Sequence, residues 1–196
     1  MGISIGIFSS HNKHRMTNDS DLIARLKRLE RQALVDVYDT FSPGLYRYAY
    51  RLLGDADVAE DCVAETFSRL LDALRRGKGP QDYLQAYLYR VAHNWIFDYH
   101  RYSLPLATEL PEILPAPDPL PEPETMLREE QARLRAALAK LTPEQQQVIA
   151  LKYLEEWENE QVACALDKPI GAVKSLQHRA LASLKRFLEK DDKYGR

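Results

Sequence analysis

A proline-rich segment divides the chain of 196 residues into two parts. Seven of the eleven prolines lie in the stretch PLATELPEILPAPDPLPEP, residues 105–123. Proline lacks a backbone N–H and its ring clashes with the preceding turn, so this stretch cannot form one continuous helix. Prolines combined with like charges favour an extended, semi-rigid connection. We therefore expect a linker at 103–123 that holds two flanking domains apart.

The part before the linker shows helical periodicity. Apolar residues recur three and four positions apart in four stretches, at 20–32, 34–53, 56–76 and 81–101. Pro43 falls inside the second stretch, where it predicts either a kink or the start of a new helix. Gly54 is expected to end this stretch, and Asp55 is expected to cap the third. No stretch shows the two-residue alternation of a β-strand.

The part after the linker is predicted to be helical too. Helices are expected at 124–140, 143–154, 158–166 and 170–188, with Thr142 as an N-cap and Pro143 at the first helical position. Only the turn DKPI separates the last two helices, which is the spacing of a helix-turn-helix. The predicted fold class is all-α, with two small helical domains at 20–102 and 124–196. Residues 1–19 are expected to be a disordered tail.

The charged residues are unevenly distributed. A formal net charge of −2 argues against a uniformly basic nucleic-acid binder. Residues 170–190, however, hold five basic residues and one acidic residue, whereas residues 102–124 hold five acidic residues and no Lys or Arg. The start of the last helix would present amide, hydroxyl and cationic groups that can contact phosphates and base edges. These candidate DNA-binding residues are Ala172, Lys174, Ser175, Gln177, His178 and Arg179.

Several other classes of protein are disfavoured. The apolar alternation at residues 3–8 is too short for a spanning helix or a signal segment, so we expect a cytoplasmic protein without membrane insertion. Cys62 and Cys164 lie in helical apolar patterns, which favours buried thiols over a disulfide. Neither metal-ligand spacing nor a nucleophile motif is present in the sequence. We therefore expect no cofactor, no metal and no catalytic residue.

The C-terminal part has a family resemblance. Its segment LTPEQQQVIALKYLEEWENEQVACALDKPIGAVKSLQHRALASLK, residues 141–185, resembles the fourth conserved region of extracytoplasmic-function (ECF) sigma factors of bacterial RNA polymerase. In that family this region reads the upstream promoter element. The family usually has glycine where Asp167 stands, a basic residue where Leu176 stands and an apolar one where Gln177 stands. The last two exchanges are expected to remove one charge from the DNA-reading face and to alter or weaken binding. The strongest candidates for DNA contact are Lys174, His178 and Arg179.

The N-terminal part resembles the same family. The segment LYRYAYRLLGDADVAEDCVAETFSRLLDALRR, residues 45–76, is similar to the sigma helices that dock on the polymerase clamp. Asp57, Asp61 and Glu65 recur every four residues on the face opposite the apolar stripe, and this spacing alone fits solvation as well as docking. The resemblance implies that this acidic stripe contacts a basic coiled-coil of core RNA polymerase. Asp61 and Glu65 stand at the matching positions.

A second N-terminal segment, AYLYRVAHNWIFDYHRY at 86–102, resembles the sigma helix that opens the promoter. The family pattern there has an Asn and an Asp four residues apart near a basic residue, and the loop at 75–79 resembles the one that captures a base. Opening needs a cationic rim for the displaced strand and a pocket that holds a flipped base. The aromatic residues at helical spacing are expected to be mostly core: Tyr83, Tyr87, Tyr89, Trp95, Phe97 and Tyr99. The implied downstream-element residues are Arg75, Arg76, Lys78, Arg90, Asn94, Asp98, His100 and Arg101.

Taken together, these features predict a sigma factor. Its N-terminal domain would bind polymerase and open the downstream element of promoter DNA, while its C-terminal domain anchors the upstream element. Family members are commonly inhibited by an anti-sigma factor, so such a partner is implied. The alternative is a helix-turn-helix regulator with an N-terminal sensory or dimerisation domain, which leaves the acidic stripe and Asn94 with Asp98 unexplained. A metalloenzyme using the acidic stripe is disfavoured because three carboxylates without a His seldom suffice.

Overall fold

Residues 20–103 and 122–194 are described in a computed structural model of the chain. Every regular element in these ranges is a helix, which confirms the all-α prediction. The predicted tail at 1–19 and most of the predicted linker lie outside the described residues. Residue 103 ends one helix and residue 122 begins the next, so both edges of the predicted linker are helical.

The N-terminal unit consists of four helices. They are α1 (Ser20–Lys27), α2 (Arg31–Leu53), α3 (Ala56–Arg75) and α4 (Leu84–Ser103). Both signals at the junction of α2 and α3 are confirmed. Gly54 has φ +78° and donates its N–H to the carbonyl of Tyr50 at 2.8 Å, and Asp55 accepts from the N–H of Val58 at 3.0 Å. Pro43 lies inside α2 and starts no new helix. Pro43 has no N–H to donate to the carbonyl of Asp39, and both residues are exposed.

The C-terminal unit contains α5 (Glu122–Ala139), α6 (Pro143–Ile149), a π-helical turn η1 (Ala150–Leu154), α7 (Asn159–Leu166) and α8 (Ile170–Tyr194). Thr142 caps α6 through a complete capping box with Gln145, both hydrogen bonds being 3.3 Å long. The helix expected at 143–154 is α-helical only to Ile149, because the π-helical turn η1 begins at Ala150. Asp167 ends α7 in the left-handed conformation, with φ +54°. The turn to α8 follows at once, which confirms the helix-turn-helix.

The core of the C-terminal unit leaves out two apolar residues of α8 and includes one that the prediction placed on the reading face. Ile170 and Leu181 are 39% and 42% exposed. Leu176, expected on the reading face, is only 5% exposed. The buried stripe of α8 runs through Val173, Leu176 and Ala180, three and four residues apart. Leu181 follows Ala180 and is therefore turned about 100° away from this stripe.

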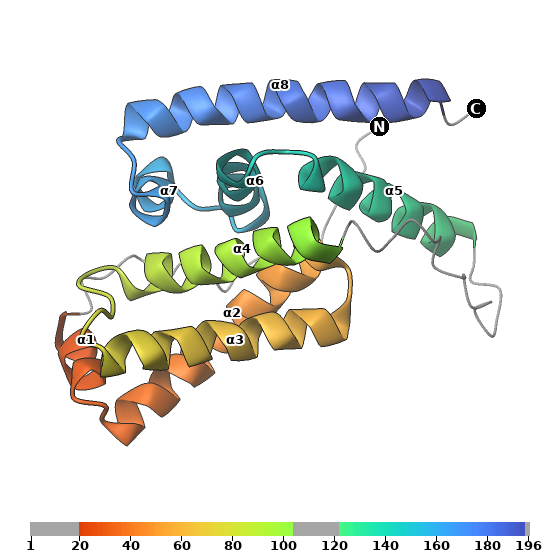
Figure 1. Cartoon of the computed structure of the whole chain (residues 1–196). Coiled ribbons are helices and arrows are strands. Elements are labelled where there is room, and N and C mark those ends of the chain that lie inside the picture. Colours follow the sequence, from red (N-terminus) through yellow and green to blue (C-terminus); the bar gives the residue numbers. More distant parts are fainter. Residues whose placement is uncertain (1–19, 104–121, 195–196) are drawn as a thin grey trace.

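The two units pack against each other. Figure 1 shows α6 and α7 between α8 and α4, and α4 contacts both of them. In addition, α5 and η1 contact α2. The expectation that the linker holds the domains apart is thus wrong for the described residues.

Helix α4 is buried on two sides as a result. One side faces α2 and α3 and the other faces the C-terminal unit. Of the six aromatic residues expected to be mostly core, only Tyr89 is buried; Trp95 is half-buried and stacks on Tyr99, which is 36% exposed. The fully buried residues of α4 also include His93, which the sequence reading did not place in the core.

Both cysteines are free thiols. Cys62 is buried, and burial raises its pKa to about 12. Cys164 is only half-buried, so the expectation of a buried thiol holds fully for Cys62 alone. Among the residues that the structure describes, no helix combines the length and the apolar character that a membrane crossing requires.

Candidate nucleic-acid and polymerase interfaces

The first half of α8 presents polar side chains to solvent. Lys174, Ser175, His178 and Arg179 are exposed, and Ala172 is half-buried. The Ser175 hydroxyl donates to the carbonyl of Gly171 at 3.1 Å. Four of the six candidate residues for the upstream element are therefore accessible on the second helix of the helix-turn-helix, where a DNA major groove would meet them.

Gln177 has a fixed position at the edge of this face. Its side chain is half-buried, and its amide Nε2 donates to Oδ1 of Asn159 at 2.9 Å. Asn159 is the first residue of α7, so this bond joins the two helices of the motif. The expected loss of one charge from the reading face is wrong, because position 176 faces the core. The role of Asn159 was missed, since nothing in the sequence pairs two residues 18 positions apart.

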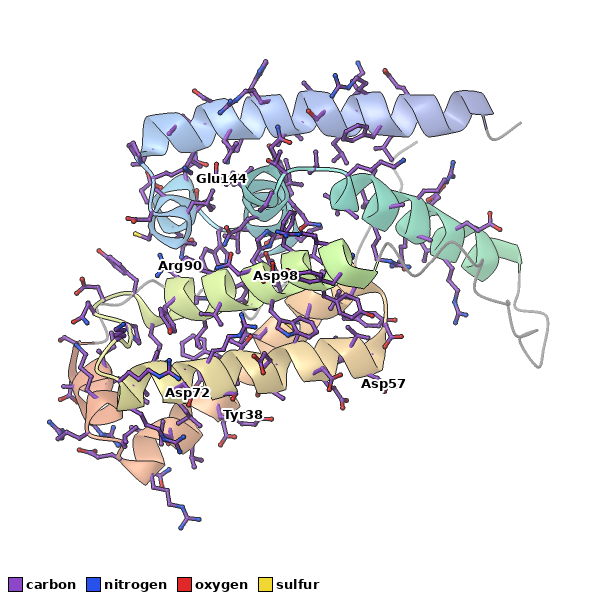
Figure 2. The ribbon with its side chains drawn as sticks, in the orientation of Figure 1. Tyr38, Asp57, Asp72, Arg90, Asp98 and Glu144 are labelled. Carbon is purple, nitrogen blue, oxygen red and sulfur yellow. The ribbon has the colours of Figure 1, made fainter. Side chains whose placement is uncertain are left out.

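Helix α4 carries a second exposed stripe. Arg90, Asn94, Asp98 and Arg101 follow one another at four, four and three residues, which places them on one face. Asn94, Asp98 and Arg101 are exposed, while Arg90 is half-buried with its guanidinium 5.9 Å from the centre of the Tyr87 ring. Figure 2 labels Arg90 and Asp98 at different points along α4, with Arg90 on the side toward α7. We call these four residues the promoter stripe.

The loop before α4 forms a separate basic group. Arg75, Arg76 and Lys78 are all exposed, and Gly77 has φ +68°, a conformation that favours glycine. From the start of α4 at Leu84 to Asp98 the helix rises roughly 21 Å. The structure therefore places the predicted downstream-element residues in two groups, one in the segment before α4 and one along α4 from Arg90 to Arg101.

His100 lies apart from both groups. Its ring is half-buried and lies near the backbone of Leu52 at the end of α2. Burial lowers the pKa of His100 below its ordinary value of 6.5. The imidazole is therefore neutral at pH 7 and adds no positive charge to a rim for DNA.

The acidic stripe lies on the exposed face of α3. Asp57 and Asp61 are exposed, and Figure 2 shows Asp57 near one end of the helix and Asp72 near the other. Glu65 is half-buried, and one of its oxygens lies 2.8 Å from Nε of Arg69. The unpaired negative charge of the predicted docking stripe is therefore concentrated at Asp57 and Asp61. In the described part of the chain, no cluster of His, Cys, Asp and Glu side chains could hold a metal ion.

A buried polar chain, which the sequence reading missed, crosses from one unit to the other. The Tyr48 hydroxyl lies 2.8 Å from Nδ1 of His93, and Nε2 of His93 lies 2.9 Å from the carbonyl oxygen of Pro143. A carbonyl oxygen only accepts, so Nε2 carries the proton and Nδ1 accepts from the tyrosine. Burial lowers the pKa of His93 to about 4, which keeps the ring neutral. His93 thus joins α2, α4 and the start of α6.

Glu155 makes a second connection between the units. Its side chain is only 4% exposed, and Oε1 accepts from Arg51 at 2.9 Å. The hydroxyl of Tyr89 donates to Oε2 at 3.3 Å, and the Tyr89 ring lies 4.9 Å from that of Trp157. Burial raises the pKa of Glu155, and the neighbouring Arg51 opposes this shift. The segment EEWENE, where Glu155 lies, gave no sequence signal for such a role.

Known proteins match both units. Sigma-70 region 2 matches residues 37–103, and sigma-70 region 4 matches residues 131–184. The chain is 31% identical to the ECF RNA polymerase sigma factor BldN of Streptomyces coelicolor, over 92% of this chain and 71% of that protein. It is also 31% identical to the ECF sigma factor SigL of Mycobacterium tuberculosis, over 78% of this chain and 87% of SigL.

Solved structures share the fold. CnrH in complex with the cytosolic domain of CnrY superposes with a TM-score of 0.60 at 22% identity, over 88% of this chain and 98% of CnrH. RpoE of Bartonella quintana, solved with the anti-sigma factor NepR, gives a TM-score of 0.50 at 22% identity, over 80% of this chain and 98% of RpoE. With region 2 on α2–α4 and region 4 on the helix-turn-helix, the chain belongs to the ECF sigma factors of the sigma-70 family, which direct bacterial RNA polymerase to promoters.

Proposed function

We propose a division of labour among three helices of this sigma factor. Helix α3 binds core RNA polymerase, α4 with its preceding loop opens the downstream promoter element, and the first half of α8 anchors the upstream element. One observation carries the proposal: each helix exposes a polar stripe of different chemistry while its opposite face is buried. A regulator with a sensory N-terminal domain would need neither the acidic stripe nor the promoter stripe.

At the upstream element, α8 supplies the contacts. Lys174 and Arg179 are exposed cations for phosphates or guanine edges, and Ser175 and His178 lie beside them. Gln177 faces DNA in an orientation fixed by Asn159, so it is a candidate for reading a base rather than a phosphate. Ala172 is half-buried at the start of the helix and can make only an apolar contact.

At the downstream element, two groups of residues contact the DNA. The loop cations Arg75, Arg76 and Lys78 attract the backbone of a displaced strand. Asn94 and Asp98 on the promoter stripe can hydrogen-bond the edge of an unpaired base, and Arg101 lies one turn further along the helix. His100 contributes to packing against α2 rather than to the contact with DNA.

Asp57 and Asp61 bind polymerase. Glu65 contributes less, because its carboxylate forms an ion pair with Arg69. Two exposed carboxylates one turn apart fit a basic helical surface, for which electrostatic attraction raises the association rate. The family resemblance also implies an anti-sigma factor as a partner that competes for these faces. Because core polymerase and promoter DNA are the other partners, we place the chain in the cytoplasm.

The proposal is tested by reconstitution with purified core RNA polymerase. The chain should comigrate with core in one-to-one stoichiometry during gel filtration and should start transcripts that core alone does not make. A helix-turn-helix regulator would bind DNA without comigrating with core and would not redirect it. Comigration without new transcripts would contradict the roles given to α4 and α8.

A further inference from the structure

The loop between α3 and α4, residues 76–83, is fixed to α3 in its first half. The backbone N–H groups of Gly77 and Lys78 donate to carbonyls of the last turn of α3, at 3.0 and 2.8 Å. Gly79 is buried, and a Cβ atom at this position would lie 2.7 Å from Cδ2 of Leu74. The chain therefore leaves α3 close against its surface.

Helix α1 supports the second half of this loop. The side-chain amide of Gln81 makes two hydrogen bonds: Oε1 accepts from Nζ of Lys27 at 2.8 Å, and Nε2 donates to the carbonyl of Gly79 at 3.3 Å. Lys27 is the last residue of α1 and lies 54 positions before Gln81. Figure 1 shows α1 beside the segment that leads into α4. We call the two bonds of this amide the loop brace, because they join the loop to itself and to a helix that is distant in the sequence.

The last residue of the loop has a strained backbone. Tyr83 has φ +27°, which is rare for a residue with a Cβ atom. Its carbonyl nevertheless accepts from the N–H of Tyr87 at 3.1 Å, so the first turn of α4 follows directly. Such a conformation persists where the surrounding structure determines the path of the chain. The loop is therefore held in one path from α3 to α4.

This path decides where the loop cations lie. Arg75, Arg76 and Lys78 are exposed, and the proposed function assigns the displaced strand to them. Groups that are already in place lose less conformational freedom when they bind, so a braced loop binds more tightly than a mobile one. Lys27 is exposed beside them, and its bond to a neutral amide leaves its positive charge unchanged.

We propose that Lys27 and Gln81 are positioning residues for promoter opening: through the loop brace, α1 holds the loop so that its cations meet the displaced strand without rearrangement. This inference rests on the proposed function, which places the displaced strand on the loop. It extends the promoter-opening site to α1, which lies before the residues 37–103 that match sigma-70 region 2. Lys27 and Gln81 act through Arg76 and Lys78 and need no contact with DNA of their own.

The first test is the rate of open-complex formation by holoenzyme on a promoter identified by transcript mapping. Lys27→Met keeps the side-chain stem and removes the donor, and Gln81→Met removes both bonds of the brace. Each should slow opening about threefold, as expected for the loss of one exposed hydrogen bond, while binding to core polymerase is unchanged. The double variant should be no slower than the slower single variant, because both residues act through one bond. Lys27→Arg keeps a donor and should restore most of the rate.

Arg28→Met is the matched control. It removes one exposed positive charge from the neighbouring residue, whose Nε lies 2.8 Å from a carboxylate oxygen of Glu30 rather than at the loop. It should leave the rate of opening unchanged. If Lys27 acted only through its charge, Arg28→Met would slow opening as much as Lys27→Met, and Gln81→Met would have no effect. Either result, or additive losses in the double variant, would overturn the proposal.

Hydrogen exchange in the full chain without polymerase separates the brace from the proposed function. In Lys27→Met, the backbone N–H groups of residues 79–83 should exchange at least about threefold faster, because the loop opens more often, while those in the middle of α4 should not change. Unchanged exchange in the loop would overturn the brace. If the parent chain starts no transcripts with core polymerase, the proposed function fails, and the exchange measurement still decides whether α1 holds the loop.

Discussion

At the scale of single residues, His93 shows how burial fixes a protonation state. Its ring is enclosed between Tyr48 and the carbonyl of Pro143, in a place where a charged imidazole would lose its hydration. Because Pro143 can only accept, the neutral ring has its proton on Nε2. His93 lies in the segment that resembles the promoter-opening helix. Its side chain nevertheless belongs to the contact between the two units.

This state predicts a pH dependence of stability. The folded pKa of His93 is lowered to about 4, so its contribution to the free energy of unfolding is fully present above the unfolded value of 6.5 and is lost as the pH falls toward 4. At about 1.4 kcal/mol per pKa unit the loss approaches roughly 3 kcal/mol. Urea unfolding from pH 7 to pH 4 should show this loss, and His93→Gln should reduce it. His100 acts in the same direction and Glu155 in the opposite one. A ring that is protonated at pH 5.5 by nitrogen-15 NMR would contradict the prediction.

Asp167 predicts a stabilising substitution. It holds φ +54° in the turn of the helix-turn-helix, where the family usually has glycine. The left-handed conformation is sterically unfavourable for any residue that has a Cβ atom and is not unfavourable for glycine. Asp tolerates it better than most other residues. Asp167→Gly should raise the free energy of unfolding by about 0.5–1 kcal/mol, measured by urea unfolding followed by circular dichroism. Asp167→Ala is the control and should lower it; equal stability of the two variants would refute the strain.

At the scale of helices, local signals were predictable and helix faces were not. Gly54, Asp55 and Thr142 marked helix ends because capping depends on a few adjacent residues. The faces of α4 were misjudged because a single apolar stripe assumes one buried side, whereas α4 is covered on two. Leu176 is buried because it continues the stripe of Val173 and Ala180, three and four residues away, and the family preference at its position does not carry this information.

Helix α8 predicts a change in salt dependence. Lys174→Ala with Arg179→Ala should weaken promoter binding and reduce the slope of log K against log salt by about 2, at roughly 0.9 per phosphate contact. Binding to core polymerase should be unaffected. Lys185→Ala is the control, since Lys185 is exposed further along α8 beside Glu189. Fluorescence anisotropy with a promoter duplex at several salt concentrations measures the slope. An unchanged slope in the double variant would contradict the assignment of Lys174 and Arg179 to DNA contact.

Helix α3 predicts a loss of polymerase affinity. Asp61→Lys reverses one of the two unpaired carboxylates of the acidic stripe and should weaken binding to core polymerase roughly tenfold, which corresponds to about 1.4 kcal/mol. Asp72→Lys is the matched control, because Asp72 is also exposed on α3 but lies near its other end (Figure 2). Competition for core against a labelled parent chain gives both affinities. Equal losses for the two variants would show that α3 acts only through its total charge.

At the scale of the whole molecule, the arrangement of the two units could not be predicted from sequence. The bond between Arg51 and Glu155 joins residues 104 positions apart, and no local pattern encodes such a pair. The proline-rich linker suggested separation, yet a linker sets only the reach between two units and not whether their surfaces fit. The predicted domain bounds, 20–102 and 124–196, stay a prediction, because the packed units leave open whether each folds alone.

The central claim is that one chain reads two promoter elements on behalf of polymerase, and mapping of transcript starts tests it most directly. Purified core polymerase with the chain would be supplied with bacterial genomic DNA, and the 5′ ends of the transcripts sequenced. We predict new starts preceded by two short shared sequence elements at a constant spacing, which disappear with Lys174→Ala and Arg179→Ala. Starts identical to those of core alone, or new starts without two shared elements, would contradict the account.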